Sequence, residues 1–308
     1  LAEFVPGALE CSVFSVTRGE AMEVACKVAR GFTGRPGLVC VDGGWHGETG
    51  FALSLSQRED AGAFGPLMPQ VEAIPWGDAD AARQAIGRDT AAVILEPIQA
   101  ENHCRIAAAD YLAELAKVCR ANAACLVFDE TQTGFGRSGR RFAFEYTGVS
   151  PDILVLGETL GGGVFPIAVT MLTQRVNAFL NAHPMIHLST FGGSDIGCRV
   201  AARFLEVCAR ERPWATAARQ GEKLRNGLER IARDEDTPIR GVAGRGLLLS
   251  LDLGTPESAT QFCRNAAAHG LLVAPGEVAQ HCVLLRPSLL ITPAQVDEVL
   301  QGISRASG

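Results

Sequence analysis

Acidic residues that follow short apolar runs are the first candidates for chemistry in this sequence. Glu158 follows the run Ile153–Leu156 and one glycine, and three more glycines stand at 161–163. Asp129 ends the run "ACLVFD", and Glu96 follows "AAVIL". If these runs are parallel strands, their carboxyl ends meet at one edge of a sheet, where open α/β sheets bind ligands. Like charges and partial burial would raise the pKa of Glu158 toward a range useful for general acid–base catalysis, so we expect it to be partly buried beside the other two carboxylates.

Two further segments have residue types suited to binding a ring and an anion. Trp45 and His46 stand in "DGGWHGETG", where the surrounding glycines favour an indole exposed for stacking and place His46 within reach of the acids. The segment "HLSTFGGSD" at 187–195 precedes a predicted helix, and hydroxyls with backbone N–H groups at a helix start suit a phosphate. Simpler interpretations remain open, because Asp129 could merely cap the next turn and Trp45 could belong to the core.

The elements that must position these residues alternate between apolar runs and helical patterns, which is typical of βαβ units and a mostly parallel sheet flanked by helices. Strands are predicted at 37–42, 91–97, 124–130, 152–157 and 167–172, and helices at 20–31, 79–86, 108–122, 196–211 and 214–234. After the loop at 234–238 the pattern predicts a small α+β domain, with strands in 241–253 and 281–287 and helices at 257–269 and 293–304. The sequence therefore predicts an α/β fold with a large domain at 1–234 and a small C-terminal domain at 235–308.

Composition excludes several classes of function. The 308 residues carry a formal net charge of −6 with a pI near 5.6, which argues against a nucleic-acid partner. No run of eighteen apolar residues and no basic-then-apolar leader is found, so we expect a cytoplasmic protein with a small-molecule substrate and no membrane partner. The ten cysteines are scattered without any CxxC pair, which predicts buried thiols and no metal site.

Several longer motifs resemble one family across essentially the whole chain. The segments "EPIQAE", "LVFDETQTGFGRSGRRFAFEYTGVSPDILVLGETLGGG", "PIAVTML" and "STFGG" are similar to those of the class III (ornithine/acetylornithine-type) aminotransferases, which have fold type I and depend on pyridoxal phosphate (PLP). The resemblance implies that Asp129 pairs with the pyridine nitrogen, which keeps the ring an electron sink, and that Trp45 stacks on the ring. It further implies that Gln132 lies near the phenolic oxygen and that Thr190 binds phosphate across a homodimer interface.

The sequence departs from the family pattern at the residue that matters most. Glu158 stands where the family has the lysine that forms the Schiff base with PLP, and a carboxylate cannot form an imine. Only Lys27, Lys117 and Lys223 are present, each in a helical pattern away from the strand ends. Without the amine, transamination should lose many orders of magnitude in rate, at about 1.4 kcal/mol for each factor of ten.

Other departures alter the binding of cofactor and substrate. The family's phosphate cup reads Ser-Gly-(small), whereas this chain has Thr17, Arg18 and Gly19, so that a side chain, which could still contact a phosphate, stands where backbone should approach it. The substrate-carboxylate arginine of the family aligns with Leu284, but Arg286 lies two residues on and so on the same face of a strand; together with Glu96 it is a candidate for substrate binding. The family's N-terminal segment, roughly 80–100 residues on the scale of a small domain, is expected to be absent.

Three functions compete on these observations. The first is a repurposed biosynthetic enzyme of specialised metabolism in which Glu158, with Asp129 and His46, runs acid–base chemistry of a lyase, isomerase, decarboxylase or cyclase type. The second is a catalytically inactive scaffold or regulatory subunit, and the third is a PLP aminotransferase carrying a lysine substitution. The first hypothesis is compatible with weak, non-covalent binding of PLP or its amine form (PMP), or with no cofactor.

Overall fold

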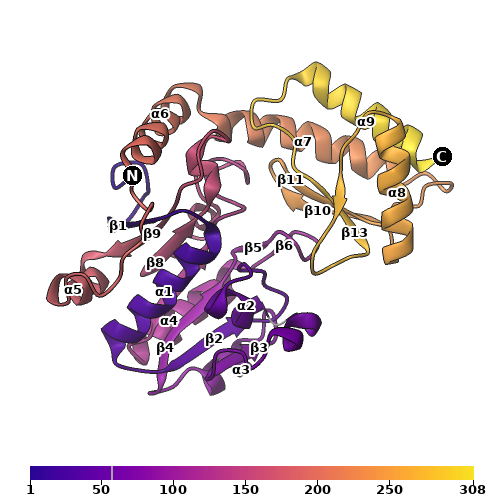
Figure 1. Ribbon diagram of the computed structural model, residues 1–308. Coiled ribbons are helices and arrows are strands. Elements are labelled where there is room, and N and C mark those ends of the chain that lie inside the picture. Colours follow the sequence, from indigo (N-terminus) through magenta and orange to yellow (C-terminus); the bar gives the residue numbers. More distant parts are fainter. Residues whose placement is uncertain (57) are drawn as a thin grey trace. The chain divides into compact units, whose positions relative to one another are not determined.

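The chain forms two compact units, which are described separately. The computed structural model describes residues 1–56 and 58–308 (Figure 1). Unit 1 comprises Leu1–Pro97, Ala107–Gly134 and Phe144–Glu211, and unit 2 comprises Ile98–Ile106, Phe135–Ala143 and Arg212–Gly308. The domain boundary expected after residue 234 lies just beyond helix α7 (Pro213–Ile231), a helix that belongs to unit 2.

Unit 1 is built on a seven-stranded, mostly parallel sheet, as the sequence predicts. Its order is β1-β9-β8-β7-β4-β2-β3. The strands are β1 (Leu9–Ser15), β2 (Gly37–Val41), β3 (Val71–Ile74), β4 (Thr90–Leu95), β7 (Cys125–Asp129), β8 (Ile153–Leu156) and β9 (Ala168–Thr173). The strands from β8 to β3 pair in parallel, whereas β9 is antiparallel to both β8 and β1. All residues of β2 after Gly37, and all residues of β4, β7 and β8, are buried, which explains their continuous apolar sequences.

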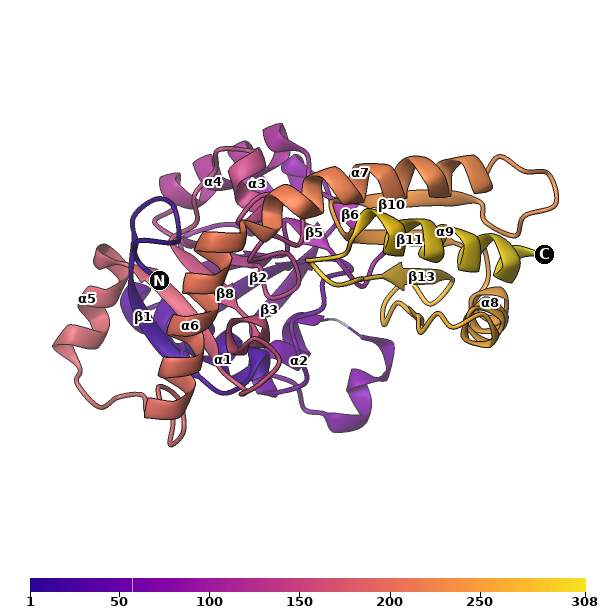
Figure 2. The same ribbon diagram turned by 90° about the horizontal axis from the view of Figure 1, so that it is seen from above.

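Helices cover both faces of this sheet. Figure 2 shows α1 (Arg18–Thr33) and α2 (Gly50–Ser56) on one side, and α3 (Ala79–Ala85) and α4 (Ala109–Ala121) on the other. The remaining helices are α5 (Gln174–Ala182) and α6 (Asp195–Glu211), and the 3₁₀ turns are η1 (Glu59–Phe64), η2 (Ala143–Tyr146), which begins at the last residue of a unit 2 segment, and η3 (Glu158–Gly161). Helix α1 packs across β1, β4, β8 and β9.

Unit 2 contains an antiparallel sheet of order β10-β11-β13-β12. The strands are β10 (Gly241–Arg245), β11 (Leu248–Asp252), β12 (Ala274–Pro275) and β13 (Cys282–Leu285), and the helices are α7, α8 (Pro256–Ala268) and α9 (Pro293–Ser307). One face of the sheet, with Leu249, Leu251 and Val283, packs into a core formed with residues of these helices. On the other face, Leu248 and Leu284 contact the hairpin of β5 (Ile98–Gln99) and β6 (Arg105–Ile106).

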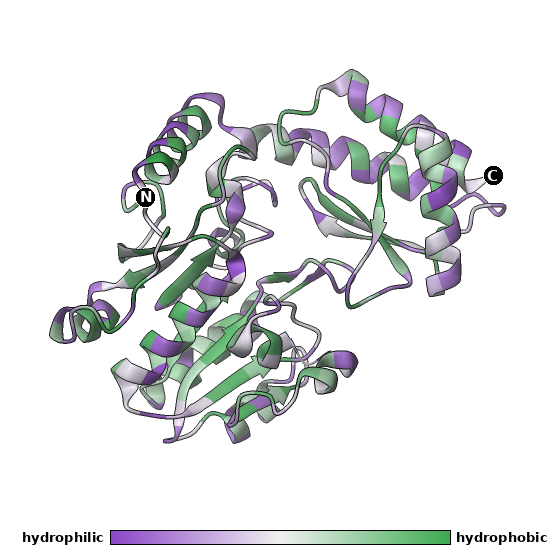
Figure 3. Cartoon of the chain, viewed as in Figure 1, coloured by the Kyte–Doolittle hydropathy of each residue, from purple (hydrophilic) through white to green (hydrophobic). Residues whose placement is uncertain are grey.

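The hydropathy of the chain follows this arrangement. Figure 3 shows the central strands of unit 1 in green, and the helices carry purple residues as well as green ones. Within residues 1–56 and 58–308, no helix combines the length and the apolar character that crossing a bilayer would require.

Candidate functional site

Neighbouring strand ends bring the predicted site residues together in unit 1. The strands β8, β7, β4 and β2 are adjacent in the sheet, and Glu158, Asp129, Glu96 and the pair Trp45–His46 follow or end them in that order. Strand β1 runs in the same direction as β8, because both are antiparallel to β9, so α1 also begins at this edge. The ends of these strands therefore meet at one edge of the sheet, as expected.

Asp129 is the centre of the site. It is 1% exposed, and its Oδ1 accepts hydrogen bonds from the backbone N–H of Thr131 at 3.0 Å and from the Thr131 hydroxyl at 2.7 Å. Its Oδ2 lies 2.8 Å from Nδ1 of His46 and 3.1 Å from a guanidinium nitrogen of Arg18. Burial alone would raise the pKa of Asp129, but Arg18, His46 and Thr131 together hold this pKa well below its ordinary value. The lowered pKa favours the charged form of Asp129 at neutral pH.

The guanidinium of Arg18 lies over the ring of Trp45. Its Cζ is 4.3 Å from the ring centroid, and the residue is 6% exposed. The same guanidinium pairs with Asp129, lies 3.6 Å from the carboxylate of Glu96, and donates to the backbone carbonyl of Trp45. A planar cation thus lies against the indole face and is hydrogen-bonded to the central carboxylate, an arrangement that combines a cation–π contact with buried ion pairs.

The carboxylate of Glu158, a residue of the turn after β8, lies at the start of helix α1. Its Oε1 accepts the backbone N–H of Arg18 at 2.6 Å, which places an anion at the positive end of the helix dipole. Thr17 caps the same helix, with its hydroxyl accepting from the N–H of Glu20 at 3.3 Å. The side chain of Glu158 is exposed, so the expectation of a partly buried Glu158 is wrong. The physical reason is that Glu158 opens the 3₁₀ turn η3 beyond β8 rather than extending the buried strand.

The loop after β2 fixes the indole and the imidazole. The backbone N–H of Trp45 donates to Glu96 Oε2 at 3.0 Å, and the backbone N–H of His46 donates to the Ser56 hydroxyl at 2.9 Å. Gly47 has φ of +123°, and a Cβ there would lie 3.2 Å from Cα of Gly19, so the loop and the first turn of α1 approach more closely than larger residues would permit. His46 is 0% exposed, which keeps its imidazole away from any ligand that stays in solvent.

Three further predicted residues lie in the turn after β7, in the turn before α6 and in unit 2. Gln132 is half-buried in the turn that follows β7, and Thr190 is exposed in the turn before α6. Arg286 belongs to unit 2, where its guanidinium pairs with Glu101 at 2.9 Å. Sequence reasoning missed Thr131, although an aspartate commonly accepts a hydrogen bond from the backbone N–H two residues further on.

The fold matches that of the PLP-dependent aminotransferases. The model of the aminotransferase class-III family matches residues 1–307, and the chain belongs to this family. An uncharacterized aminotransferase of Archaeoglobus fulgidus is 33% identical over 306 residues, which span 99% of this chain and 72% of the relative. The ornithine aminotransferase of Toxoplasma gondii has a TM-score of 0.90 and 30% identity, with 96% of this chain and 72% of that chain covered. An omega-transaminase of Thermomicrobium roseum has a TM-score of 0.89 and 25% identity, with 99% and 76% covered.

The site can now be tested for the PLP on which the homologous aminotransferases depend. The guanidinium of Arg18 already covers one face of the Trp45 indole, with Cζ 4.3 Å from the ring centroid, and a pyridine ring stacked on that face would displace it. Asp129, which the resemblance assigns to the ring nitrogen, is already held by Arg18, His46 and Thr131. A phosphate at the start of α1 would need the N–H of Arg18, which Glu158 accepts. The residues in this arrangement do not fit the cofactor.

Proposed function

We propose that this chain is a non-transaminating member of the class III family that serves as a scaffold or regulatory subunit and forms a homodimer. One observation carries the proposal: the side chains of Arg18 and Glu158 reproduce the charges of the cofactor. The guanidinium of Arg18 takes the place of a pyridinium between Trp45 and Asp129, and the carboxylate of Glu158 takes that of a phosphate at the start of α1.

The loss of the Schiff-base amine supports this proposal. By the family resemblance, Glu158 takes the position of the family lysine, and the three lysines of the chain have other surroundings. Lys27 lies nine residues after Arg18 in α1, about 13 Å along the axis, with Nζ 2.9 Å from Nδ1 of His187. Lys117 pairs with Glu114 on the surface, and Lys223 pairs with Asp297 in unit 2.

The state of the former catalytic groups also supports a structural role. The lowered pKa of Asp129 keeps it charged, and its partners Arg18 and His46 are both buried. Groups that neutralise one another in the interior stabilise a fold only if all are present, and they are poor proton shuttles because they have little access to substrate. The site has the properties of a buried polar core rather than of an open acid–base centre.

A second copy of the chain is the partner that we propose. Six large apolar side chains between residues 164 and 196 are more than half exposed: Val164, Met185, Ile186, Leu188, Phe191 and Ile196. Thr190, which the family resemblance assigns to a dimer interface, lies in the same stretch. Exposed apolar side chains concentrated in one segment are typical of an interaction surface.

A second candidate function is a cofactor-independent acid–base enzyme that uses Glu158. The observation that favours it is the exposure of the Glu158 side chain at the edge of the sheet, which leaves this carboxylate accessible to a small molecule. The two candidates differ in the expected effect of Glu158→Gln. This change abolishes turnover in an enzyme, whereas in a subunit it leaves both the dimer and its partners unchanged.

The experiment compares covalent capture of PLP by four proteins: wild type, Arg18→Ser, Glu158→Lys and the double variant. Each is incubated with excess PLP, reduced with borohydride, digested and mapped by mass spectrometry. We expect an adduct at position 158 only where lysine has been introduced, and a much higher yield in the double variant because the ring position has been cleared. An adduct at one of the three native lysines together with amino-group transfer by the wild type would refute the proposal.

The dimer is tested by light scattering during size-exclusion chromatography. Leu188→Asp and Phe191→Asp should convert the dimer to a monomer. Leu272→Asp is the matched control, since Leu272 is 98% exposed but belongs to unit 2. A monomeric wild type at high protein concentration, or equal loss of the dimer in the control, would contradict the assignment of this surface.

A further inference from the structure

A second group of chemically active side chains lies on the sheet of unit 2. Asp252 in β11 is directly opposite Cys282 in β13, and residues that oppose one another in an antiparallel pair project from the same face. Ser250 lies two residues before Asp252 and therefore on that face as well. The apolar residues of the other face pack into the helical core, so this polar row belongs to the face that contacts the β5–β6 hairpin.

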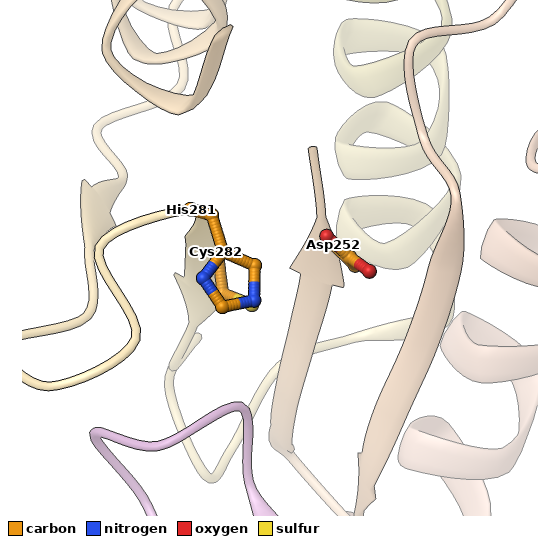
Figure 4. A group of neighbouring side chains, drawn as sticks. All are labelled: Asp252, His281 and Cys282. Carbon is orange, nitrogen blue, oxygen red and sulfur yellow. The ribbon is translucent and has the colours of Figure 1, made fainter. Parts of the chain in front are cut away.

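His281 completes a set of three metal-ligating residue types. One nitrogen of His281, the sulfur of Cys282 and a carboxylate oxygen of Asp252 all lie within 4.8 Å of one another. Figure 4 shows the imidazole and the thiol at the start of β13 and the carboxylate on the neighbouring strand. The backbone N–H of Leu253 donates to the carbonyl of His281 at 3.0 Å, which holds the two strands in register where the three side chains meet.

A second histidine approaches from the hairpin. Nδ1 of His103, in the turn between β5 and β6, lies 2.9 Å from the hydroxyl of Ser250. Burial lowers the pKa of His103, Asp252 acts to raise it and His281 to lower it, so both side chains lie within electrostatic reach of this imidazole. All four potential ligands belong to unit 2 and come from three separate segments of the chain.

We propose that Asp252, His281 and Cys282 bind a zinc-type divalent cation, with His103 or water as the fourth ligand. Thiolate, imidazole and carboxylate together favour zinc over the hard cations calcium and magnesium. Bonds of about 2.0–2.3 Å in a tetrahedral site place ligand atoms about 3.3–3.7 Å apart, so separations of up to 4.8 Å need to shorten by at most about 1.5 Å. Side-chain rotation can supply this movement, since His281 and Asp252 are only half-buried. On binding, the thiol of Cys282 loses its proton to solvent.

Cysteine spacing in the sequence could not reveal this proposed metal site. The cysteines contain no CxxC pair, and their spacing therefore predicts no metal site. His281 and Cys282 come close to Asp252 only through the pairing of β11 with β13, which the spacing does not show. A cation bound to these residues and to His103 would join the hairpin to the sheet. Its role in unit 2 is therefore to fix the position of residues 98–106.

The probe is Zn²⁺ alone, added to the metal-stripped full chain and followed by calorimetry, with Co²⁺ as the spectroscopic substitute. We expect one Zn²⁺ per chain and a sulfur-to-cobalt charge-transfer band. Cys282→Ser should remove this band, and His281→Gln and Asp252→Asn should each weaken Zn²⁺ binding by at least tenfold. Asn at 252 can still accept the N–H of Gly254, which now donates to Asp252 at 2.8 Å, so this variant keeps the local turn.

Cys263→Ser is the matched control, because Cys263 is a half-buried thiol of the same unit in α8. This variant should retain the band and the affinity of the wild type. The proposal is overturned if the wild type binds no Zn²⁺, if the cobalt complex lacks a thiolate band, or if folded His281→Gln and Asp252→Asn proteins bind as tightly as the wild type. Circular dichroism of each variant separates loss of a ligand from loss of the fold.

Discussion

Replacing Arg18 by methionine tests whether this side chain neutralises the centre of unit 1. Methionine fills much of the space of the arginine stem but supplies no charge. Asp129 and Glu96, which are 1% and 2% exposed, would remain buried without their guanidinium partner. Removing one member of a buried ion pair typically costs about 3–5 kcal/mol, to which the lost contact with Trp45 adds about 1 kcal/mol. Because His46 remains beside Asp129, we expect a loss of about 3 kcal/mol.

The assay is urea or thermal unfolding, with Arg83→Met as the matched control. Arg83 also pairs with two carboxylates, those of Asp80 and Glu114, but at the surface, where such pairs contribute about 0–1 kcal/mol. For units of 150–250 residues, about 2–4 °C of melting temperature corresponds to each kcal/mol, so Arg18→Met should lower the melting temperature of unit 1 by about 6–12 °C. If the melting temperatures of both variants fall by the same small amount, Arg18 is not the counter-ion of a buried site and the reasoning fails.

The pH dependence of the unfolding free energy provides a second test of the ion pair between Arg18 and Asp129. The pKa of Asp129 is lowered in the folded wild type, so its contribution to stability is complete above the unfolded value of about 3.9 and is lost as the pH falls below it. Without Arg18, burial raises the pKa of Asp129. Protonation of Asp129 as the pH falls then removes the free-energy cost of burying an unpaired carboxylate. The difference in unfolding free energy between wild type and Arg18→Met should therefore narrow between pH 7 and about pH 4. A difference that widens over this range would show that Asp129 is not the group involved.

Three further variants test individual contacts. Thr131→Val removes the hydroxyl that donates to Asp129 at 2.7 Å and should cost about 1–3 kcal/mol in urea unfolding, whereas an unchanged midpoint would mean that the bond contributes nothing. Glu158→Gln keeps an oxygen for the N–H of Arg18 but removes the anion from the start of α1, so a loss of about 0.5 kcal/mol is expected, and a gain would contradict the dipole argument. Gly221→Ala improves helix propensity in α7 by about 1 kcal/mol, but the added Cβ would lie 2.1 Å from the carbonyl oxygen of Gly246. Thermal unfolding should therefore show a net loss of stability, and the gain that propensity alone predicts would contradict the clash.

The strands predicted from the sequence are those with continuous apolar residues. All five predicted strands of unit 1 are present, because strands buried on both faces need apolar side chains at every position. Strand β1 is buried only at its first and last residues and contains Glu10, and β3 is an edge strand of four residues, so neither has that signature. The β5–β6 hairpin joins unit 2 through contacts with Leu248 and Leu284, which local sequence cannot indicate.

The candidate site was predictable in its position but not in its internal contacts. Parallel strand ends place Glu96, Asp129 and Glu158 at one edge whatever their rotamers, so their proximity follows from the topology alone. The direction of the Arg18 side chain depends on which anions and aromatic faces are within reach of its four torsions. For that reason the sequence identified an altered phosphate cup but not an arginine lying between Trp45 and Asp129.

The position of Arg18 also answers an objection to a non-catalytic role. A scaffold has no need of residues that bind a cofactor ring, so the presence of Trp45 and Asp129 would by itself favour an enzyme. In this chain both residues have another partner: the indole lies against the guanidinium, and the aspartate neutralises it. A buried aspartate deprived of a cofactor would destabilise the sheet unless another cation replaced the pyridinium. With Arg18 in that place, Asp129 and Trp45 both have a partner within the protein, so their presence is not by itself a sign of catalysis.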